Sequence, residues 1–122
     1  YWVDQITNEG WKCVAKDLYG GCLFALSPPD QVAEGIASVF GVPFTGERLL
    51  DATYRAHILG VALEQKQGAT LEDYSMPEEI FVGERKGDLP GVHFLTRELF
   101  EEVRQRVVDH LKAEVDRVGY GA

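Results

Sequence analysis

The amino-acid sequence predicts an all-α protein, a small bundle of helices, because apolar residues recur every three or four positions in three long stretches. Each stretch begins near a residue that suits a helix N-cap and ends at a glycine. Runs with the strict apolar–polar alternation of a half-buried strand are scarce. We therefore expect one helical domain over residues 1–122, with helices near 28–40, 46–67 and 96–118.

The first predicted helix is defined by its two ends. Ser27 suits the N-cap, Pro28 suits the first helical position, and Asp30 adds negative charge to the first turn. Apolar residues follow at helical spacing up to the terminating Gly41, namely Val32, Ile36, Val39 and Phe40. Before this helix, residues 1–14 indicate at most a short helix, with Trp2 and Trp11 suited to a packed surface.

The two longer helices have equally clear signals. Thr45 can cap the second helix, and Gly68 stands where a glycine commonly follows a helix end. The third helix runs from about Thr96 to Val118 and is ended by Gly119, with apolar residues on one face and charged residues on the other. Between them, Pro77 and the two glutamates after it can open a single helical turn.

Composition and charge exclude some classes of function but do not identify one. Of the 122 residues, 45% are hydrophobic and 26% are charged, as in an ordinary globular domain. The net charge of −8 argues against a nucleic-acid partner or an anionic membrane. No apolar run approaches the ~20 residues of a membrane span and no signal-peptide pattern is present, so we expect a cytoplasmic location. Because Met76 is the single methionine, we also expect a fragment of a longer polypeptide.

One short stretch carries candidate chemistry: Asp17, Gly20, Gly21 and Cys22. The adjacent glycines allow a tight turn or the close approach of another group. The carboxylate can accept hydrogen bonds, and a cysteine thiolate can bind a soft metal or an iron–sulfur cluster. The same pattern also fits a structural glycine turn with a buried cysteine behind it.

The stretch from Asp17 to Phe24 resembles the Asp-x-x-Gly-Leu-Cys-x-Phe segment in the C-terminal part of the tungsten-containing aldehyde:ferredoxin oxidoreductase family. The resemblance continues through Gly46-Glu47-Arg48 and through the stretch from Gly68 to Pro77, which is similar to that family's Gly-x4-Asp-x3-Pro turn. The three motifs occur in the same order as in the family, and together they cover roughly half of the chain. Two departures stand out: Gly21 replaces the usual leucine, and Tyr74 replaces the second acid that follows Asp73.

The resemblance implies the C-terminal helical domain of an enzyme that oxidises aldehydes to carboxylic acids with ferredoxin as electron acceptor. Asp17, Gly20 and Gly21 would contact a tungsten (or molybdenum) bis-pterin, and Cys22 would be the fourth ligand of a [4Fe-4S] cluster. The implied partners are the remainder of the parent polypeptide, ferredoxin, a small aldehyde and, as an open alternative, a second copy. No catalytic residue is assigned. A four-cysteine cluster needs more than the two cysteines of this chain, so we expect the isolated chain to bind no cofactor and to be inactive.

Other interpretations stay open beside this one. The chain can instead be a non-catalytic helical scaffold or interaction module related to the same family. Arg48, Arg55 and His57 could bind an anion, or they could be solvated charges beside a core stripe. A zinc site built from Cys13, Cys22, His57 and His93 lacks the local ligand spacing that such sites show.

Overall fold

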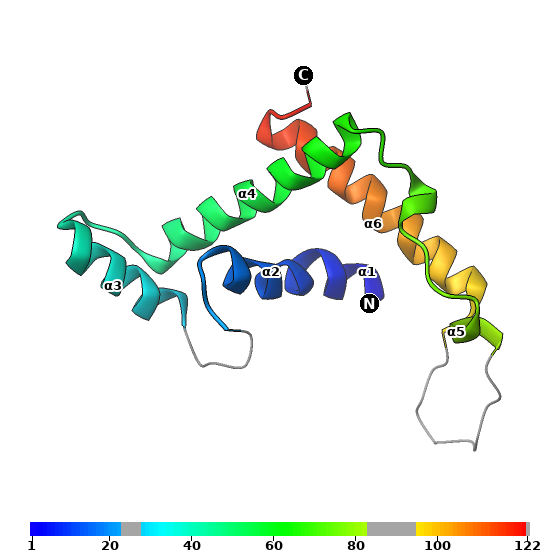
Figure 1. The fold of residues 1–122 in the computed structure, drawn as a ribbon, viewed down its shortest axis with the longest axis horizontal. Helices are drawn as coiled ribbons and strands as arrows, with labels where there is room; N and C mark the ends of the chain where they lie inside the picture. Colours follow the sequence, from blue (N-terminus) through cyan, green and yellow to red (C-terminus); the bar gives the residue numbers. More distant parts are fainter. Residues whose placement is uncertain (23–27, 83–94, 122) are drawn as a thin grey trace, which may run out of the picture.

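The computed structural model describes residues 1–22, 28–82 and 95–121 of the chain (Figure 1). Within these residues the all-α prediction is confirmed, since the regular elements are all helices and none is a strand. The helix α4 (Gly46–Lys66) lies at the centre of the arrangement. The helices α2 and α3 pack along its N-terminal half, and α6 crosses its C-terminal half, so that α4 and α6 form a wide V (Figure 1).

The chain starts with a long helical run, which we call the N-terminal run: α1 (Trp2–Asp4), a π-helical stretch (Gln5–Gly10) and α2 (Trp11–Leu18). Local sequence signals indicated only a short helix here. The run is longer because α2 packs against α4, where the Trp11 ring meets the Tyr54 ring edge-on at 4.9 Å and Ala15 is only 1% exposed. Tertiary packing of this kind outweighs weak local propensity.

The helix α3 (Pro29–Phe40) begins one residue later than the sequence suggested. Pro28 occupies the N-cap position in an extended conformation, and Pro29 takes the first helical position that the pyrrolidine ring suits. Ser27, the expected cap, lies outside the described residues. The helix ends as predicted at Gly41, whose φ of 67° is in the left-handed region.

The predicted cap Thr45 and the predicted terminal glycines of the two longest helices are confirmed, and Thr96 caps the second of them. The Thr45 hydroxyl accepts a hydrogen bond from the Arg48 N–H at 3.3 Å, and the chain turns at Gly68 with a φ of 91°. In α6 (Arg97–Val118), the Thr96 hydroxyl accepts from the Leu99 N–H at 3.2 Å, and Gly119 follows the last turn with a φ of 90°. Two short elements connect these helices, a 3-10 turn (Leu71–Asp73) and α5 (Glu79–Val82).

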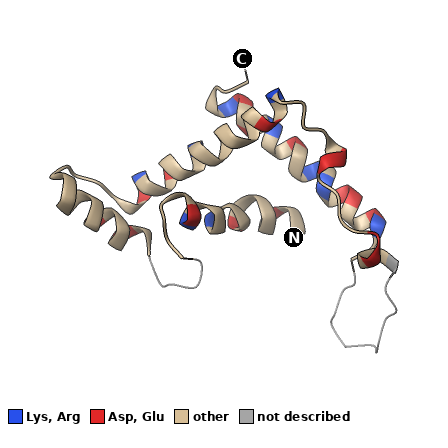
Figure 2. Cartoon of the chain, in the orientation of Figure 1, with Lys and Arg blue, Asp and Glu red and all other residues tan. Residues whose placement is uncertain are grey.

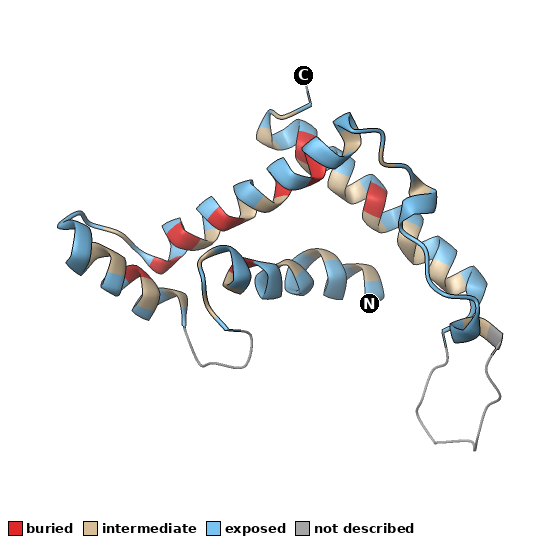
Figure 3. Cartoon of the chain, viewed as in Figure 1, coloured by how far each residue is buried: buried red, intermediate tan, exposed pale blue. Residues whose placement is uncertain are grey.

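The core is small and lies where α4 crosses α6. Its buried members are Ile58, Val61, Ala62 and Val115, against which half-buried Tyr54, Leu111, Val118 and Tyr120 pack. A second contact, between α4 and the helices α2 and α3, buries Ala15, Ala33, Gly46 and Leu49, of which all but Leu49 have a small side chain or none. Buried positions thus gather along α4, while much of α3 and of the N-terminal run is exposed (Figure 3).

Charge is unevenly distributed over these elements. Acidic and basic side chains alternate along α6, whereas α3 carries few charges (Figure 2). The segment of residues 35–46, which includes the end of α3, has no charged residue at all. No helix in the described part of the chain combines the length and the apolar character that crossing a bilayer requires.

Candidate functional site

The candidate residues Asp17, Gly20, Gly21 and Cys22 lie at the C-terminal end of α2. The Gly20 N–H donates to the Asp17 carbonyl at 3.1 Å, and the Gly21 N–H donates to the Lys16 carbonyl at 2.7 Å. This pair of bonds is the Schellman arrangement that closes many helices. It requires a left-handed residue, and Gly20 supplies it with a φ of 81°. The glycine turn that the sequence predicted is therefore present.

Gly21 has its own reason to lack a side chain. A Cβ at this position would lie 2.8 Å from Cε2 of the Tyr19 ring and 3.3 Å from the Lys16 carbonyl oxygen. Both distances are shorter than ordinary van der Waals contacts, so a larger residue would force the ring to move. A side chain at this position therefore conflicts with the placement of Tyr19 against the helix end.

The two side chains with candidate chemistry, those of Asp17 and Cys22, are both exposed. The interpretation of a buried cysteine behind a glycine turn required the Cys22 thiol to lie in the core. The thiol is exposed instead. Residues 23–27, which follow directly, lie outside the described residues.

The donor set at this helix end is small. Across residues 1–22, 28–82 and 95–121, no group of three or more His, Cys, Asp or Glu side chains is arranged to hold a metal ion. Cys13 is also a free, exposed cysteine, on α2. The turn after α2 offers the exposed thiol of Cys22 and the exposed carboxylate of Asp17, with Gly20 and Gly21 between them. This set fits a ligand contributed from one side to a group that is held mainly elsewhere.

The three residues of the candidate anion site, Arg48, Arg55 and His57, do not border one common hollow. Arg48 and Arg55 border a shallow hollow of about 550 Å³, but Glu47 and Asp51 border it too. The Arg55 guanidinium is paired with Asp51 at 3.0 Å, which cancels its charge locally. His57 borders a different hollow, next to Trp11 and Val14, where burial lowers its pKa despite the opposing effect of Glu64. His93, the fourth member of the zinc alternative, lies outside the described residues.

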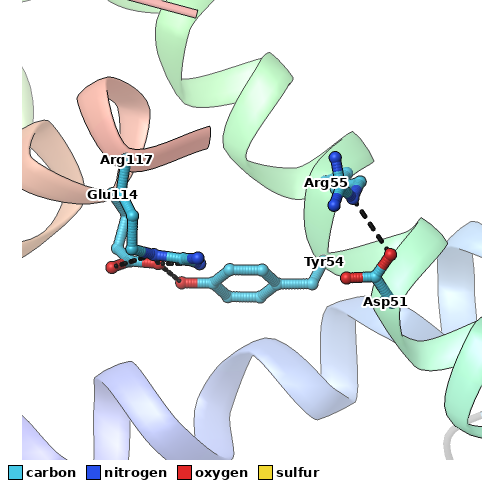
Figure 4. Close-up of polar contacts among 5 residues, drawn as sticks. All are labelled: Asp51, Tyr54, Arg55, Glu114 and Arg117. Atoms are coloured by element: carbon cyan, nitrogen blue, oxygen red, sulfur yellow. Dashed lines mark hydrogen bonds and ion pairs between the residues drawn. The ribbon is translucent and has the colours of Figure 1, made fainter. Parts of the chain in front are cut away.

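A polar cluster joins α4 to α6 and was not predicted from the sequence (Figure 4). The Tyr54 hydroxyl donates to Oε2 of Glu114 at 2.5 Å, and Nε of Arg117 donates to both Glu114 carboxylate oxygens at 2.9 Å. The spacing of Glu114 and Arg117 on one helix is a visible signal, since residues three apart share a face. Their tyrosine partner is 60 positions away and has no such signal.

The electrostatics of this cluster assign it a structural role. The hydrogen bonds of Arg117 and Tyr54 lower the pKa of Glu114 to about 2. Burial and the Glu114 carboxylate raise the pKa of Tyr54 to about 12. A catalytic acid or base works best with a pKa near the operating pH. The pKa values of Glu114 and Tyr54 both lie far from neutral pH. Tyr54 therefore stays protonated and Glu114 stays ionised, and together they hold α4 and α6 in place.

Comparison of the chain with protein-family models, with curated proteins and with solved structures finds no match.

Proposed function

We propose that this chain is the C-terminal helical domain of a tungsten (or molybdenum) pterin iron–sulfur oxidoreductase that oxidises aldehydes to carboxylic acids, with ferredoxin as the electron acceptor. The supporting observations are the resemblance of three motifs in the family's order and the all-α fold. The observation that carries the proposal is the end of α2, where Asp17 and Cys22 flank a Schellman turn and expose both functional side chains.

In this role each residue has a defined task. The Cys22 thiolate would ligate the iron–sulfur cluster, and the Asp17 carboxylate would accept hydrogen bonds from N–H groups of the pterin. Gly20 and Gly21 would let the backbone turn tightly at the helix end, where the Tyr19 ring already lies against Gly21. The bound cofactors supply the two-electron chemistry and the electron transfer, while this domain contributes ligation and orientation.

The companion ligands of such a cluster come from the remainder of the parent polypeptide. Apart from Cys22, the sequence has one cysteine, Cys13, and it lies on α2 rather than in the turn. We therefore expect the isolated chain to take up less than one cluster per molecule on reconstitution with iron and sulfide. Iron and acid-labile sulfide analysis measures this, and stable uptake of one [4Fe-4S] cluster per chain would contradict the proposal.

The decisive experiment replaces Cys22 in the full-length enzyme. Cys22→Ala should abolish or alter the paramagnetic signal of the reduced cluster and reduce aldehyde oxidation, while the far-ultraviolet circular dichroism stays unchanged. Cys13→Ala is the control, because it removes the other exposed thiol, which lies on α2 and outside the turn. Asp17→Asn keeps the shape and removes the charge, so pterin content or turnover should fall with the cluster intact.

A second candidate, a non-catalytic interaction module with the same scaffold, is favoured by a different observation. Val39 and Phe40, at the end of α3, are 78% and 72% exposed, and the uncharged segment 35–46 surrounds them. Exposed apolar residues that are grouped in this way often mark a contact surface. An unchanged cluster spectrum and unchanged turnover in Cys22→Ala would leave Cys22 as a surface thiol and favour this alternative.

A further inference from the structure

The turn after α2 joins two glycines directly to Cys22. A glycine loses more backbone freedom on ordering than any other residue, and here Gly20 and Gly21 are adjacent. The side chain of Cys22 is exposed, so the core does not orient the thiol. The turn is closed by backbone hydrogen bonds, one of which joins the Gly21 N–H to the Lys16 carbonyl at 2.7 Å. The orientation of Cys22 therefore depends on what lies against Gly21.

The side chain that lies against Gly21 is the ring of Tyr19. Its Cε2 and Cδ2 atoms are 2.8 and 3.4 Å from the point where a Cβ of residue 21 would stand. The ring therefore covers the face of Gly21 from which a side chain would project. Tyr19 is itself half-buried, although it comes directly after the last residue of α2. Its ring is thus folded back over the turn and does not extend into solvent.

The backbone at residue 21 would accept a side chain if the ring lay elsewhere. Gly20 has a positive φ of 81°, but Gly21 does not have a positive φ. The other close neighbour of the missing Cβ is the Lys16 carbonyl oxygen, at 3.3 Å, which a shift of a few tenths of an ångström would relieve. The Tyr19 ring and a side chain at residue 21 therefore compete for one place, and in this chain the ring occupies it.

We propose that Tyr19 is a positioning residue for Cys22. Its ring takes the place of a side chain at residue 21, orders the two glycines and so limits the orientations of the thiol. A group that is ordered before it binds loses less conformational entropy on binding, which would favour ligation of the cluster. The positioning of a cluster ligand rests on the proposed function, whereas the ordering of the turn does not.

The ordering of the turn is tested with a nitroxide spin label on Cys22, in the Cys13→Ala background. The mobility of the label, measured from its electron paramagnetic resonance line shape, should rise in Tyr19→Ala because the ring no longer covers Gly21. Tyr19→Phe keeps the ring and should leave the mobility unchanged. Circular dichroism verifies that each variant keeps the helical fold.

The matched control for the loss of a tyrosine ring is Tyr74→Ala. The Tyr74 hydroxyl donates to Glu64, near the C-terminal end of α4, whereas α2 and its turn pack along the N-terminal half of that helix. The mobility of the label on Cys22 should therefore stay unchanged in Tyr74→Ala.

A second substitution tests whether the ring and a side chain at residue 21 share one place. Adding Gly21→Leu to Tyr19→Ala should return the label to its original mobility, because leucine fills the place that the ring has left. Gly21→Ala in the same background is the control. Alanine restricts the backbone in the same way as leucine but fills little of the place, so it should restore much less.

In the full-length enzyme the measurement is made on the cluster and not on turnover. Tyr19→Ala should shift the midpoint potential of the cluster upward, because the turn beside its ligand opens to water, which stabilises the more negative reduced cluster. The rate of cluster loss to an iron chelator should rise about fivefold, since the ligand is less ordered. Tyr19→Phe should keep the parent values of both. A residue that only stabilised the fold would not change the potential of the folded enzyme.

Four outcomes would overturn the proposal. They are an unchanged label mobility in Tyr19→Ala, an equal rise in Tyr74→Ala, a rescue by alanine at residue 21 as complete as that by leucine, and an unchanged cluster potential in Tyr19→Ala. Failure of the proposed function gives a different result, namely an intact cluster in Cys22→Ala with a label that still responds to Tyr19. That result would also overturn the role of Tyr19 in positioning a ligand.

Discussion

The two ends of α4 are packed in opposite ways. Its C-terminal half meets α6 through branched aliphatic and aromatic side chains, with Ile58 completely buried. Its N-terminal half meets α2 and α3 at several residues with little or no side chain, Ala15, Ala33 and Gly46, beside the buried Leu49. The first contact is stabilised by large side chains that fill the core. The second requires small residues, because the helices approach one another closely there. The same helix should therefore respond to substitutions of opposite kind at its two ends.

The largest effect is expected from removing volume at the crossing of α4 and α6. Ile58→Ala leaves a cavity in the core, and it should lower the free energy of unfolding by about 2–5 kcal/mol. Leu59→Ala is the neighbouring control: that side chain is 42% exposed, so its loss should cost much less. Urea denaturation followed by circular dichroism measures both variants. Similar losses in the two would mean that the crossing is not the core of the fold.

Adding volume should be harmful at the other end of α4. The missing Cβ of Gly46 would lie 2.9 Å from the backbone nitrogen of Asp30, which cannot move aside as a flexible side chain can. Gly46→Ala should therefore lower the free energy of unfolding by about 1–3 kcal/mol. Gly60, in the same helix, has no neighbour within 4 Å of its missing Cβ, and Gly60→Ala should raise stability by about 1 kcal/mol. A gain in both variants would disprove the close approach of α3 and α4.

Substitutions in the polar cluster at the crossing of α4 and α6 should change stability less. Tyr54→Phe keeps the ring against Trp11 but removes the donor to Glu114, so stability should fall by about 1–2 kcal/mol. Arg55→Gln, at the adjacent position, breaks only an exposed ion pair with Asp51 and should change stability by less than about 0.5 kcal/mol. The same denaturation experiment compares them. A Tyr54→Phe variant as stable as Arg55→Gln would mean that the cluster does not stabilise the crossing.

The last prediction concerns pH. Glu114 has a pKa lowered from 4.5 to about 2 in the folded chain, so its stabilising contribution is complete above pH 4.5 and is lost as the pH falls toward 2. Tyr54 has a pKa raised from 10.0 to about 12, so its contribution is complete below pH 10 and is lost as the pH rises toward 12. Unfolding free energies measured across these ranges should decline at both ends. Glu114→Gln should flatten the acid decline, and Tyr54→Phe should flatten the alkaline one.

The ends of the helices could be predicted because their signals are local. Thr45, Thr96, Gly41 and Gly119 act on backbone groups within a few residues, so the sequence alone reveals them. The helical run through Leu18 was underestimated, although Trp11, Val14, Ala15 and Leu18 recur at helical spacing in the sequence. The Tyr54–Glu114 hydrogen bond had no sequence signal, because it joins residues 60 positions apart.

The candidate site was predictable to a similar extent. The turn at Gly20 follows from glycine pairs and local geometry, and the sequence predicted it. Neither the exposure of Cys22 nor the constraint that Tyr19 places on Gly21 could be predicted, since both depend on side-chain placement around the helix end. The chemistry of Asp17 and Cys22 stays a prediction.

The π-helical stretch Gln5–Gly10 has a consequence for how this chain could change in evolution. A π-turn holds one residue more than an α-turn, so it behaves like a single-residue insertion that resets the phase of the helix. Trp2, before it, borders an apolar groove along α6, while Trp11, after it, meets Tyr54. Deleting one residue from the stretch would restore an α-helix and rotate Trp2 by about 100° relative to Trp11. A single codon deletion could thus dismantle one wall of the groove without altering any residue that lines it.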